Sequence, residues 1–309
     1  MGCENQTVWT EFVLLGIPYP QQLYTPLFLF FLLVYFLSIT GNILILLTVA
    51  SKSDLHKPMY WFLCNLAIMD IAVSTVVVPK VMDGFVEGGR IISFGGCLTQ
   101  LFFYHFLSCS EFFLYTVMAY DRFLAICKPL HYNTIMNHRM CFCLSLGTWL
   151  GGCLHSIMVT SLSYGLPYGP KNEVNFILCE ILSVLKLACS DTWFQEIFTL
   201  VDIGLVAIFC IFFIVMSYMY IVSAILKIPS VEGQHRAFST CTSHLIVVMI
   251  CYVPAAFNYL RTGTLDLLSG VIALFYTTWT PFLNPLIYTL RNKEMKDAML
   301  RLRDRVRGL

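Results

Sequence analysis

Charge is scarce in this sequence. Only 12% of its 309 residues are Asp, Glu, Lys or Arg, whereas soluble domains carry about 25%. A soluble protein this apolar would expose large hydrophobic patches to water, so the composition predicts a membrane protein. The net charge is only +1, so there is no basic excess of the kind that nucleic-acid-binding proteins show.

Several chemical signatures are also missing. The sequence has no P-loop, no His-x-x-x-His motif and no spacing typical of a nucleophile and its base, so we expect neither an enzyme nor a bound metal or cofactor. No lysine lies between Gly270 and Leu290, which excludes a retinal-binding photoreceptor. The absence of a repeated motif disfavours an inverted-repeat transporter. The first twenty residues lack a basic region, so we expect no cleavable signal peptide.

Long hydrophobic runs, in contrast, are abundant. A spanning helix needs about twenty mainly apolar residues. Seven runs meet this need, at residues 25–50, 58–82, 97–127, 141–163, 197–226, 236–260 and 270–290. The sequence therefore predicts an all-α membrane protein, a seven-transmembrane helix bundle in one domain. We expect residues 1–24 outside, the bundle at 25–290, and a short amphipathic C-terminal helix at 291–309 lying on the inner leaflet.

The basic residues predict the orientation of the bundle. Fourteen of the 19 Lys and Arg residues fall on the side that carries the C-terminus. The positive-inside rule then places the N-terminus outside the cell and the C-terminus in the cytoplasm. Asn5-Gln6-Thr7 is a glycosylation sequon on the outer side, so we expect a glycan on Asn5.

Most of the 13 cysteines lie within the spans, where a thiol is a small hydrophobic group. Four are placed to meet an oxidising exterior, namely Cys3, Cys97, Cys179 and Cys189. The sequence alone leaves their connectivity open.

The third span ends in an acid and a base, Asp121 and Arg122, within the segment Met118–Cys127. Charge is costly in hydrocarbon, so such a pair indicates a conformational switch or an anchor. As an anchor, Arg122 would only extend to the lipid headgroups.

Four motifs carry a specific resemblance. They are Lys57–Leu63 followed by Leu66 and Asp70, then Met118–Cys127, Arg236–His244 and Pro281–Tyr288. In this order, and in the matching spans, they resemble the olfactory receptor family, tetrapod-type branch, of the rhodopsin-like G-protein-coupled receptors. The similarity extends from about Thr10 to about Lys296.

This resemblance implies a plasma-membrane receptor that binds a small volatile odorant and activates a stimulatory G protein, raising cyclic AMP. A non-olfactory receptor of the same fold, reading a small metabolite, is the alternative. The resemblance also implies an odorant pocket between the third, fifth, sixth and seventh spans. The matching positions are Tyr104, His105, Ser108, Cys109, Asp202, Val206, Tyr252, Ala255, Tyr259 and Thr277.

The resemblance further implies an activation switch at the inner end. Asp121 is expected to hold Arg122 in a charge-assisted pair while the receptor is off. Pro285 is expected to make a hinge, because a proline frees a carbonyl within a helix. The switch positions are Asp121, Arg122, Tyr218, His244, Asn284, Pro285 and Tyr288.

Besides Asp121, three carboxylates lie inside the spans. Asp70 and Glu111 cannot both stay charged in a low dielectric without a cation. Family geometry places them near Asn42 and Asn284, where a sodium ion or a shared proton would relieve them; two protonated structural acids are the alternative. For Asp202, the sequence leaves open a proton, a hydrogen bond to His105 or an ion pair with an amine ligand.

The outer cysteines also follow from the resemblance. It implies a disulfide between Cys97 and Cys179. A further loop cysteine common in the family is absent, so Cys189 lacks its usual partner and Cys3 could substitute. A loop metal site is not expected, because Phe176 stands where the family often has His.

Overall fold

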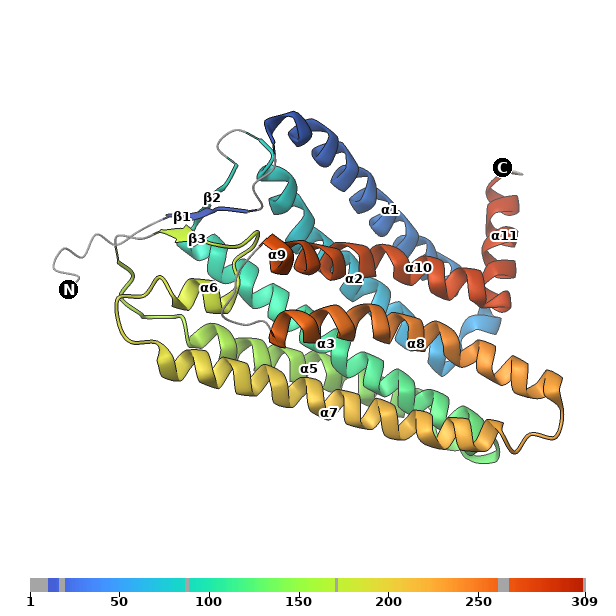
Figure 1. Cartoon of the computed structure of the whole chain (residues 1–309). Helices are drawn as coiled ribbons and strands as arrows, with labels where there is room; N and C mark the ends of the chain where they lie inside the picture. Colours follow the sequence, from blue (N-terminus) through green and yellow to red (C-terminus); the bar gives the residue numbers. More distant parts are fainter. Residues whose placement is uncertain (1–10, 17–19, 87–88, 170–171, 261–266, 308–309) are drawn as a thin grey trace.

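The computed structural model describes residues 11–16, 20–86, 89–169, 172–260 and 267–307, and most of them are helical. The long helices run side by side along the molecule (Figure 1). Six of them are long and apolar enough to cross a membrane. They are α1 (Tyr24–Ala50), α2 (Pro58–Asp83), α3 (Phe94–Cys127), α5 (His138–Ser161), α7 (Trp193–Ile225) and α8 (Val231–Leu260).

The seventh span is one continuous helical run made of three pieces. α9 (Leu267–Leu274) passes through a five-residue π-helical turn, η4 (Phe275–Trp279), into α10 (Thr280–Arg291). Pro281 lies in the first turn of α10 and Pro285 lies in its interior. The predicted seven-helix bundle is confirmed, and its helices begin and end within a few residues of the predicted runs.

Local sequence explains where several helices begin. Ser93 caps α3 by accepting the amide of Gly96 at 3.0 Å, and Asn137 caps α5 by accepting the amide of Met140 at 3.0 Å. α2 begins at Pro58. Proline suits the first turn of a helix because it has no backbone N–H, and an N–H at this position would have no partner within the helix.

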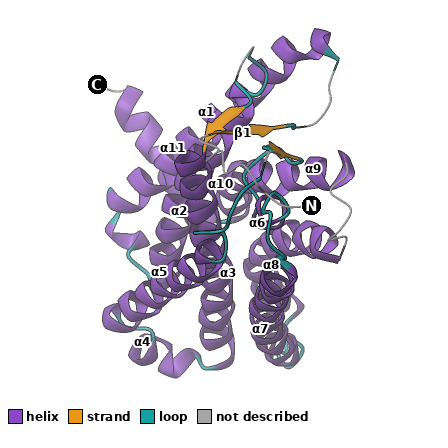
Figure 2. Ribbon diagram, turned by 90° about the vertical axis from the view of Figure 1, so that its left-hand side faces the viewer, coloured by secondary structure: helices purple, strands orange, loops and turns teal. Residues whose placement is uncertain are grey.

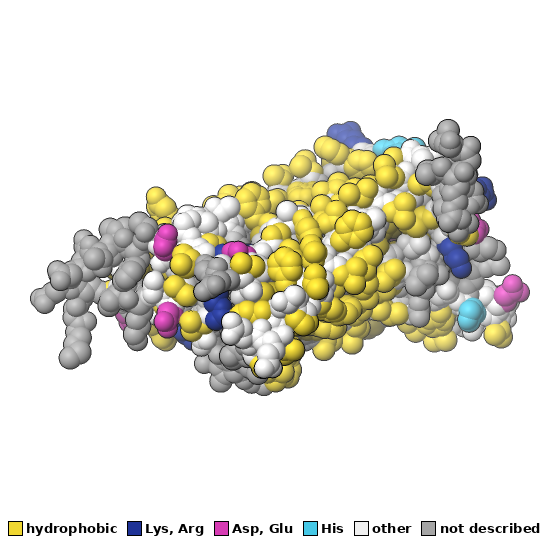
Figure 3. Space-filling model, turned by 90° about the horizontal axis from the view of Figure 1, so that it is seen from above, with side chains coloured by type: hydrophobic (Ala, Val, Ile, Leu, Met, Phe, Trp, Pro, Cys, Tyr) yellow, Lys and Arg dark blue, Asp and Glu magenta, His cyan; other side chains and the backbone are white. Residues whose placement is uncertain are grey.

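The outside of the bundle matches a lipid environment. Hydrophobic side chains cover the middle of the molecule, and charged side chains gather toward its two ends (Figure 3). On α7, for example, Leu205 and Ile208 are exposed. The chain is therefore a multi-pass membrane protein, because so wide a belt of exposed apolar side chains is stable against lipid and not against water.

α3 runs through the centre of the bundle, packed against α2, α5 and α7. Its approach to α5 is very close, since a Cβ atom on Gly152 would collide with the Ser110 hydroxyl and the Phe106 carbonyl. We call the end of the bundle at Cys127 of α3 the inner end and the opposite end the outer end, after the orientation predicted above. The largest buried cluster surrounds the inner half of α3, with Tyr60, Leu66 and Tyr115 fully enclosed. This central helix supplies side chains to both ends of the molecule.

A small sheet covers the outer end, and the sequence did not predict it. β1 (Glu11–Leu14) pairs antiparallel with β2 (Ile91–Ser93) and parallel with β3 (Glu173–Val174). The sheet and the short helix α6 (Ile181–Leu185) lie across the helix ends (Figure 2). The sheet thus joins the N-terminal segment, the loop after α2 and the long loop after α5.

The inner end carries shorter elements. They are η2 (Ser53–Leu55), η3 (Pro129–His131) and α4 (Tyr132–Ile135), while η1 (Gln21–Leu23) precedes α1 at the outer end. The predicted C-terminal helix is α11 (Lys293–Arg307), which lies across the long axis of the bundle (Figure 1). Met295 and Ala298 form its buried face, whereas Arg301 is exposed.

Candidate ligand cavity and cytoplasmic switch

A cavity of about 200 Å³ lies in the outer half of the bundle. Helices α3, α5, α7, α8 and α9 with its π-helical turn contribute to its wall, and the loop around α6 covers it. Six of the ten predicted pocket residues line it: Tyr104, His105, Ser108, Cys109, Val206 and Ala255.

Three other predicted pocket residues lie behind the wall. Tyr252 is one layer deeper, where its hydroxyl donates to the carbonyl of Phe112 at 3.3 Å and its ring packs 4.7 Å from the Phe112 ring, which does line the cavity. Thr277 is buried, and its hydroxyl donates to the carbonyl of Ala273 at 2.7 Å. Asp202 lies behind His155. The side chain of Tyr259 lies outside the described residues.

The loop around α6, which we call the lid because it covers the cavity, contributes residues that were missing from the predicted set. Phe176, Leu178, Glu180 and Leu182 line the cavity beside Cys179. A disulfide joins Cys97 at the start of α3 to Cys179, with 2.07 Å between the sulfurs. The bridge holds the middle of the loop against the bundle, so the cysteine pair was the sequence signal that could have identified this lid.

Glu180 organises the lid. Its carboxylate accepts hydrogen bonds from the amides of Leu182 at 3.1 Å and Ser183 at 2.9 Å, and thereby caps α6. Burial raises the pKa of Glu180, while the two amide hydrogen bonds act in the opposite direction. The carboxylate is therefore committed to the fold of the loop.

Three more residues line the cavity but were not predicted. Tyr276 and Asn258 lie on expected spans at positions outside the predicted set, and His155 lies on a span that was not expected to contribute. Tyr276 in the π-helical turn has its hydroxyl 3.1 Å from that of Tyr104. Asn258 donates from its amide to the carbonyl of Ser269 at 3.0 Å, joining α8 to α9. His155 projects from α5, a span absent from the predicted pocket.

The side chain next to Asp202 is His155, and not His105, which was one of the alternatives that the sequence left open. Nδ1 of His155 lies 2.9 Å from Oδ2 of Asp202. The sequence could not show this contact, because the two residues lie on helices α5 and α7, which are separated by the long loop. His105 packs instead against the ring of His155, with 6.1 Å between centroids and an interplanar angle of 81°.

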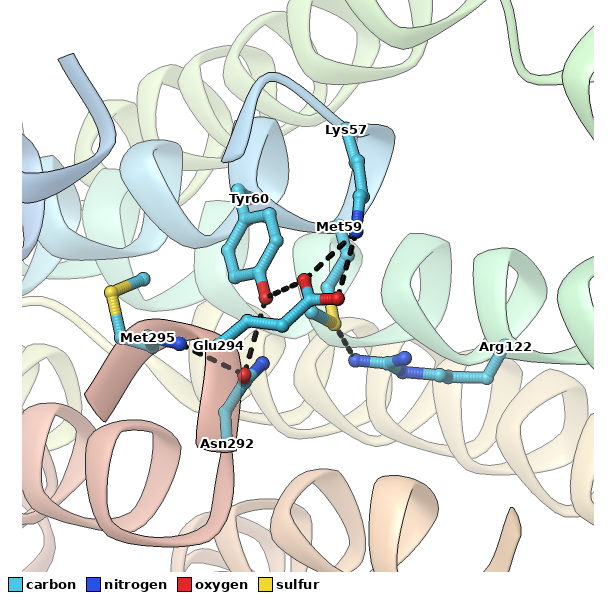
Figure 4. Close-up of polar contacts among 7 residues, drawn as sticks. All are labelled: Lys57, Met59, Tyr60, Arg122, Asn292, Glu294 and Met295. Carbon is cyan, nitrogen blue, oxygen red and sulfur yellow. Dashed lines mark hydrogen bonds and ion pairs between the residues drawn. The ribbon is translucent and has the colours of Figure 1, made fainter. Parts of the chain in front are cut away.

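At the inner end, the expected pair between Asp121 and Arg122 is absent. The hydroxyl of Tyr132 in α4 donates to Asp121 at 2.7 Å. Arg122 instead donates to the sulfur of Met59 on α2, as Figure 4 shows, and it forms no ion pair among the described residues. The correction has a simple cause: α4 brings a competing donor to Asp121, whereas the start of α2 presents an acceptor to Arg122.

A polar cluster joins α2 to α11 next to Arg122 (Figure 4). Nζ of Lys57 lies 2.9 and 2.8 Å from the two carboxylate oxygens of Glu294, and the hydroxyl of Tyr60 donates to Glu294 at 2.9 Å. The hydrogen bond from Lys57 lowers the pKa of Glu294. Asn292 caps α11 by accepting the amide of Met295 at 3.1 Å.

The remaining switch residues occupy the inner halves of α7, α8 and α10. The hydroxyl of Tyr218 lies 2.8 Å from Nδ1 of His244, and the two rings stack at 5.8 Å. Nε2 of His244 lies 3.0 Å from the carbonyl of Tyr115 on α3. The hydroxyl of Tyr288 is buried, with no hydrogen-bond partner among the described residues. Pro285 faces Gly41 of α1 closely enough that a Cβ there would be 3.2 Å from it.

The intramembrane acids lie between these two regions. Asn284 donates to both oxygens of Asp70, at 3.1 and 3.0 Å. Glu111 interacts electrostatically with Asp70, and its Oε1 has no hydrogen-bond partner in the described part of the chain. Asn42 donates instead to the carbonyls of Ser38 at 3.0 Å and Pro281 at 2.9 Å.

Two other predictions concern the outer surface and metals. Cys189 is disulfide-bonded, so it has a partner other than the family's usual loop cysteine, which this chain lacks. Cys3 and Asn5 lie outside the described residues. Across the residues that the structure describes, no group of three or more His, Cys, Asp or Glu side chains is arranged to hold a metal ion.

Comparison with known proteins gives a consistent result. The family model for the olfactory receptor matches residues 31–304. Human olfactory receptor 10G6 is 55% identical over 298 residues, which cover 96% of this chain and 90% of that protein. Human olfactory receptor 10G9 is 52% identical, with 96% of each chain covered. Mouse olfactory receptor 10D1B is 48% identical, with 96% of this chain and 95% of that protein covered.

Proposed function

The chain belongs to the olfactory receptor family, and from this membership we propose that it binds small volatile molecules inside the helix bundle and activates a stimulatory G protein, raising cyclic AMP. The cavity of about 200 Å³ beneath the disulfide-held loop is the observation that carries the proposal. A largely apolar wall with a few convergent polar groups is what a site for a small organic molecule needs.

The same proposal covers location and orientation. We place the receptor in the plasma membrane with residues 1–24 outside, the bundle at 25–290 and the tail at 291–309 in the cytoplasm. The Cys97–Cys179 disulfide supports this orientation, since disulfides persist on the oxidising side of the membrane. The excess of Lys and Arg at the opposite end supports it independently.

A continuous set of contacts leads from the cavity to the inner end. Phe112 lines the cavity and packs on Tyr252 of α8. Further along α8, His244 contacts both Tyr218 and the carbonyl of Tyr115. A ligand that moves the outer part of α8 would disturb these inner contacts, free Arg122 from Met59 and open a groove for a helix of the G protein.

The energetic demand on the ligand sets its potency. A change from 1:99 to 99:1 between closed and open states requires about 5.5 kcal/mol of differential affinity. A small volatile makes few contacts, so we expect partial activation and low potency.

The acids at mid-membrane fit a monovalent cation or a shared proton. Oε1 of Glu111 and Oδ1 of Asn284 are buried oxygens without hydrogen-bond partners among the described residues, and both lie near the carboxylate of Asp70. Oxygen ligands suit a hard cation. Sodium held there would supply the positive charge that lets two neighbouring carboxylates remain ionised; no other cofactor is proposed.

The test is a reporter experiment in cells that express the receptor with a stimulatory G protein. A chemically diverse volatile panel should contain agonists that raise cyclic AMP, and deletion of the stimulatory G protein should remove the response. Surface staining must show the receptor at the plasma membrane. If surface-expressed receptor responds to volatiles only through another G protein, the coupling that we propose is wrong; if no volatile elicits any signal, the ligand class is wrong.

A further inference from the structure

The wall of the cavity carries an acid–base pair that joins two helices. His155 of α5 lines the cavity, and Asp202 of α7 lies directly behind it. Their side chains are only 9% and 18% exposed, and Nδ1 and Oδ2 are 2.9 Å apart. The two atoms are within ion-pair distance, but they are too poorly aligned for a hydrogen bond, and neither has another hydrogen-bond partner in the described part of the chain. The pair is therefore the only ion-pair contact that either residue makes within that part.

Burial restricts the protonation of this pair. A carboxylate withdrawn from water is strongly disfavoured unless a positive charge or a proton compensates it. No lysine or arginine forms an ion pair with Asp202 among the described residues. The compensating proton must then be shared with His155, so that the pair as a whole is neutral.

Two neutral arrangements of the pair put a hydrogen on Nε2 of His155. In one, an imidazolium lies beside a carboxylate, and both ring nitrogens carry hydrogen. In the other, the carboxylic acid donates to Nδ1, and the single ring hydrogen is on Nε2. In both, Nε2 of His155 is a hydrogen-bond donor, strengthened by the acid behind it. A third neutral arrangement, in which Nδ1–H donates to the protonated acid, leaves Nε2 bare, and the comparison of benzyl alcohol with benzaldehyde below tests it.

A second imidazole lies next to this donor. His105 lines the same cavity, its ring is edge-on to that of His155, and its Nε2 has no partner among the described residues. A carbonyl oxygen has two lone pairs and can accept from both rings. An amine ligand has no such fit, because the carboxylate that would bind it already contacts His155.

We propose that this cavity selects ligands with a carbonyl oxygen, namely aldehydes, ketones and esters, which accept a hydrogen bond from Nε2 of His155. Asp202 is a positioning residue that holds the ring and its donor. This inference rests on the proposed function only in taking the cavity as the ligand site.

The test compares carbonyl compounds with alkenes of the same shape. The probes are benzaldehyde with styrene, acetophenone with alpha-methylstyrene, and cyclohexanone with methylenecyclohexane. Binding is measured by thermal stabilisation of purified full-length receptor in lipid nanodiscs, without a G protein. We expect the carbonyl member of at least one pair to bind about tenfold more tightly than its alkene, the effect of one charge-assisted hydrogen bond.

Two variants assign the discrimination to the pair. His155→Phe keeps a ring but removes the donor, and Asp202→Asn keeps the side-chain size but removes the charge; both should reduce the carbonyl preference to less than about threefold. Glu196→Gln removes a charge from the same helix α7 at a side chain that accepts from Thr192 and does not line the cavity, so it should leave the preference unchanged. If His155→Phe does not fold, Asp202→Asn decides.

Three results would overturn the proposal: no carbonyl probe binds, the alkenes bind equally well, or benzyl alcohol binds more tightly than benzaldehyde. The last would show that His155 presents a bare Nε2 instead of a donor. Because the assay contains no G protein, a receptor that prefers carbonyls but never raises cyclic AMP contradicts the proposed signalling alone. A receptor that signals to volatiles without this preference contradicts the carbonyl proposal alone.

Discussion

Some polar groups beside the outer cavity differ from those that hold the inner end closed in whether they have hydrogen-bond partners. Around the outer cavity, ring nitrogens such as Nε2 of His105 have no partner among the described residues. At the inner end, Lys57, Glu294 and Asp121 each bond to another element of the fold. The outer half thus contains buried ring nitrogens whose hydrogen-bonding capacity is unused, whereas the inner half must break contacts before a partner can enter.

This difference indicates which contacts oppose activation. A ligand gains hydrogen bonds in the outer half without first disrupting protein contacts. The inner contacts oppose opening, and each must be weaker in the open state for the ligand to shift the equilibrium. Mutations should therefore affect ligand choice at one end and signalling at the other.

The largest effect should come from Arg122→Ala, which removes the guanidinium that contacts Met59 at the inner end. We expect the cyclic-AMP response to disappear while surface expression persists, because the change lies far from the cavity. Arg139→Ala, an exposed arginine at the start of α5, is the matched control and should respond normally. A surface-expressed Arg122→Ala receptor that signals fully would show that Arg122 is only a lipid anchor.

Cys97→Ser should have the next largest effect, at the outer end. Loss of a native disulfide typically costs 2–5 kcal/mol, so we expect most of the receptor to be retained inside the cell. Cys143→Ser removes an exposed free thiol from α5 and should reach the surface normally. Flow cytometry of unpermeabilised cells measures both. Equal surface levels of the two variants would contradict a stabilising role for the bridge.

The spans could be predicted from the sequence because hydrocarbon imposes a simple rule of length and apolarity. The pocket residues came from the resemblance to the family, and six of the ten line the cavity, on α3, α7 and α8. His155 was missed because nothing local distinguishes a histidine on α5 that faces Asp202 from one that faces a lipid.

The loop and the inner contacts were less predictable. The pairing of β1 with β2 and β3 joins residues far apart in sequence through backbone groups, which carry no sequence signal in strands of two to four residues. Likewise, the adjacency of Asp121 and Arg122 suggested a pair. Tyr132 and Met59 instead provide partners that only the folded chain brings near.

A third, moderate effect should come from the lid. Glu180→Ala removes the cap of α6 and should lower the stability of the outer end by ~1 kcal/mol. Ligand affinity should fall with it, because α6 covers the cavity. Glu173→Ala in the same loop, an exposed side chain, is the control. Thermal unfolding of purified receptor measures the difference, and equal unfolding temperatures would contradict the capping role.

The pH dependence of the lid follows from the same carboxylate. Burial raises the pKa of Glu180 above its ordinary value of 4.5. The folded loop therefore binds the proton more readily than the unfolded chain, and its stability should increase as the pH falls from above the raised pKa toward 4.5. Glu180→Gln should remove this contribution; an unchanged pH profile would show that the carboxylate does not titrate in this window.

The smallest effect should come from the ion pair between α2 and α11. Lys57 and Glu294 have side chains that are 55% and 57% exposed, so the pair should contribute only ~0.2–1 kcal/mol. Because it helps to keep α11 against the start of α2, where Met59 contacts Arg122, either charge reversal should raise ligand-independent cyclic AMP by up to about fivefold. The double variant Lys57→Glu with Glu294→Lys should return toward the wild-type level, whereas Lys52→Glu in the same inner loop should change little.

The same ion pair should depend on pH and salt. The lowered pKa of Glu294 means that the contribution of the pair to stability is full above the ordinary carboxyl pKa of 4.5 and is lost as the pH falls through the lowered value. High salt should weaken it as well. If the double variant is as active as the singles, the side chains act separately, and the closed inner end depends on the contact between Arg122 and Met59 without help from α11.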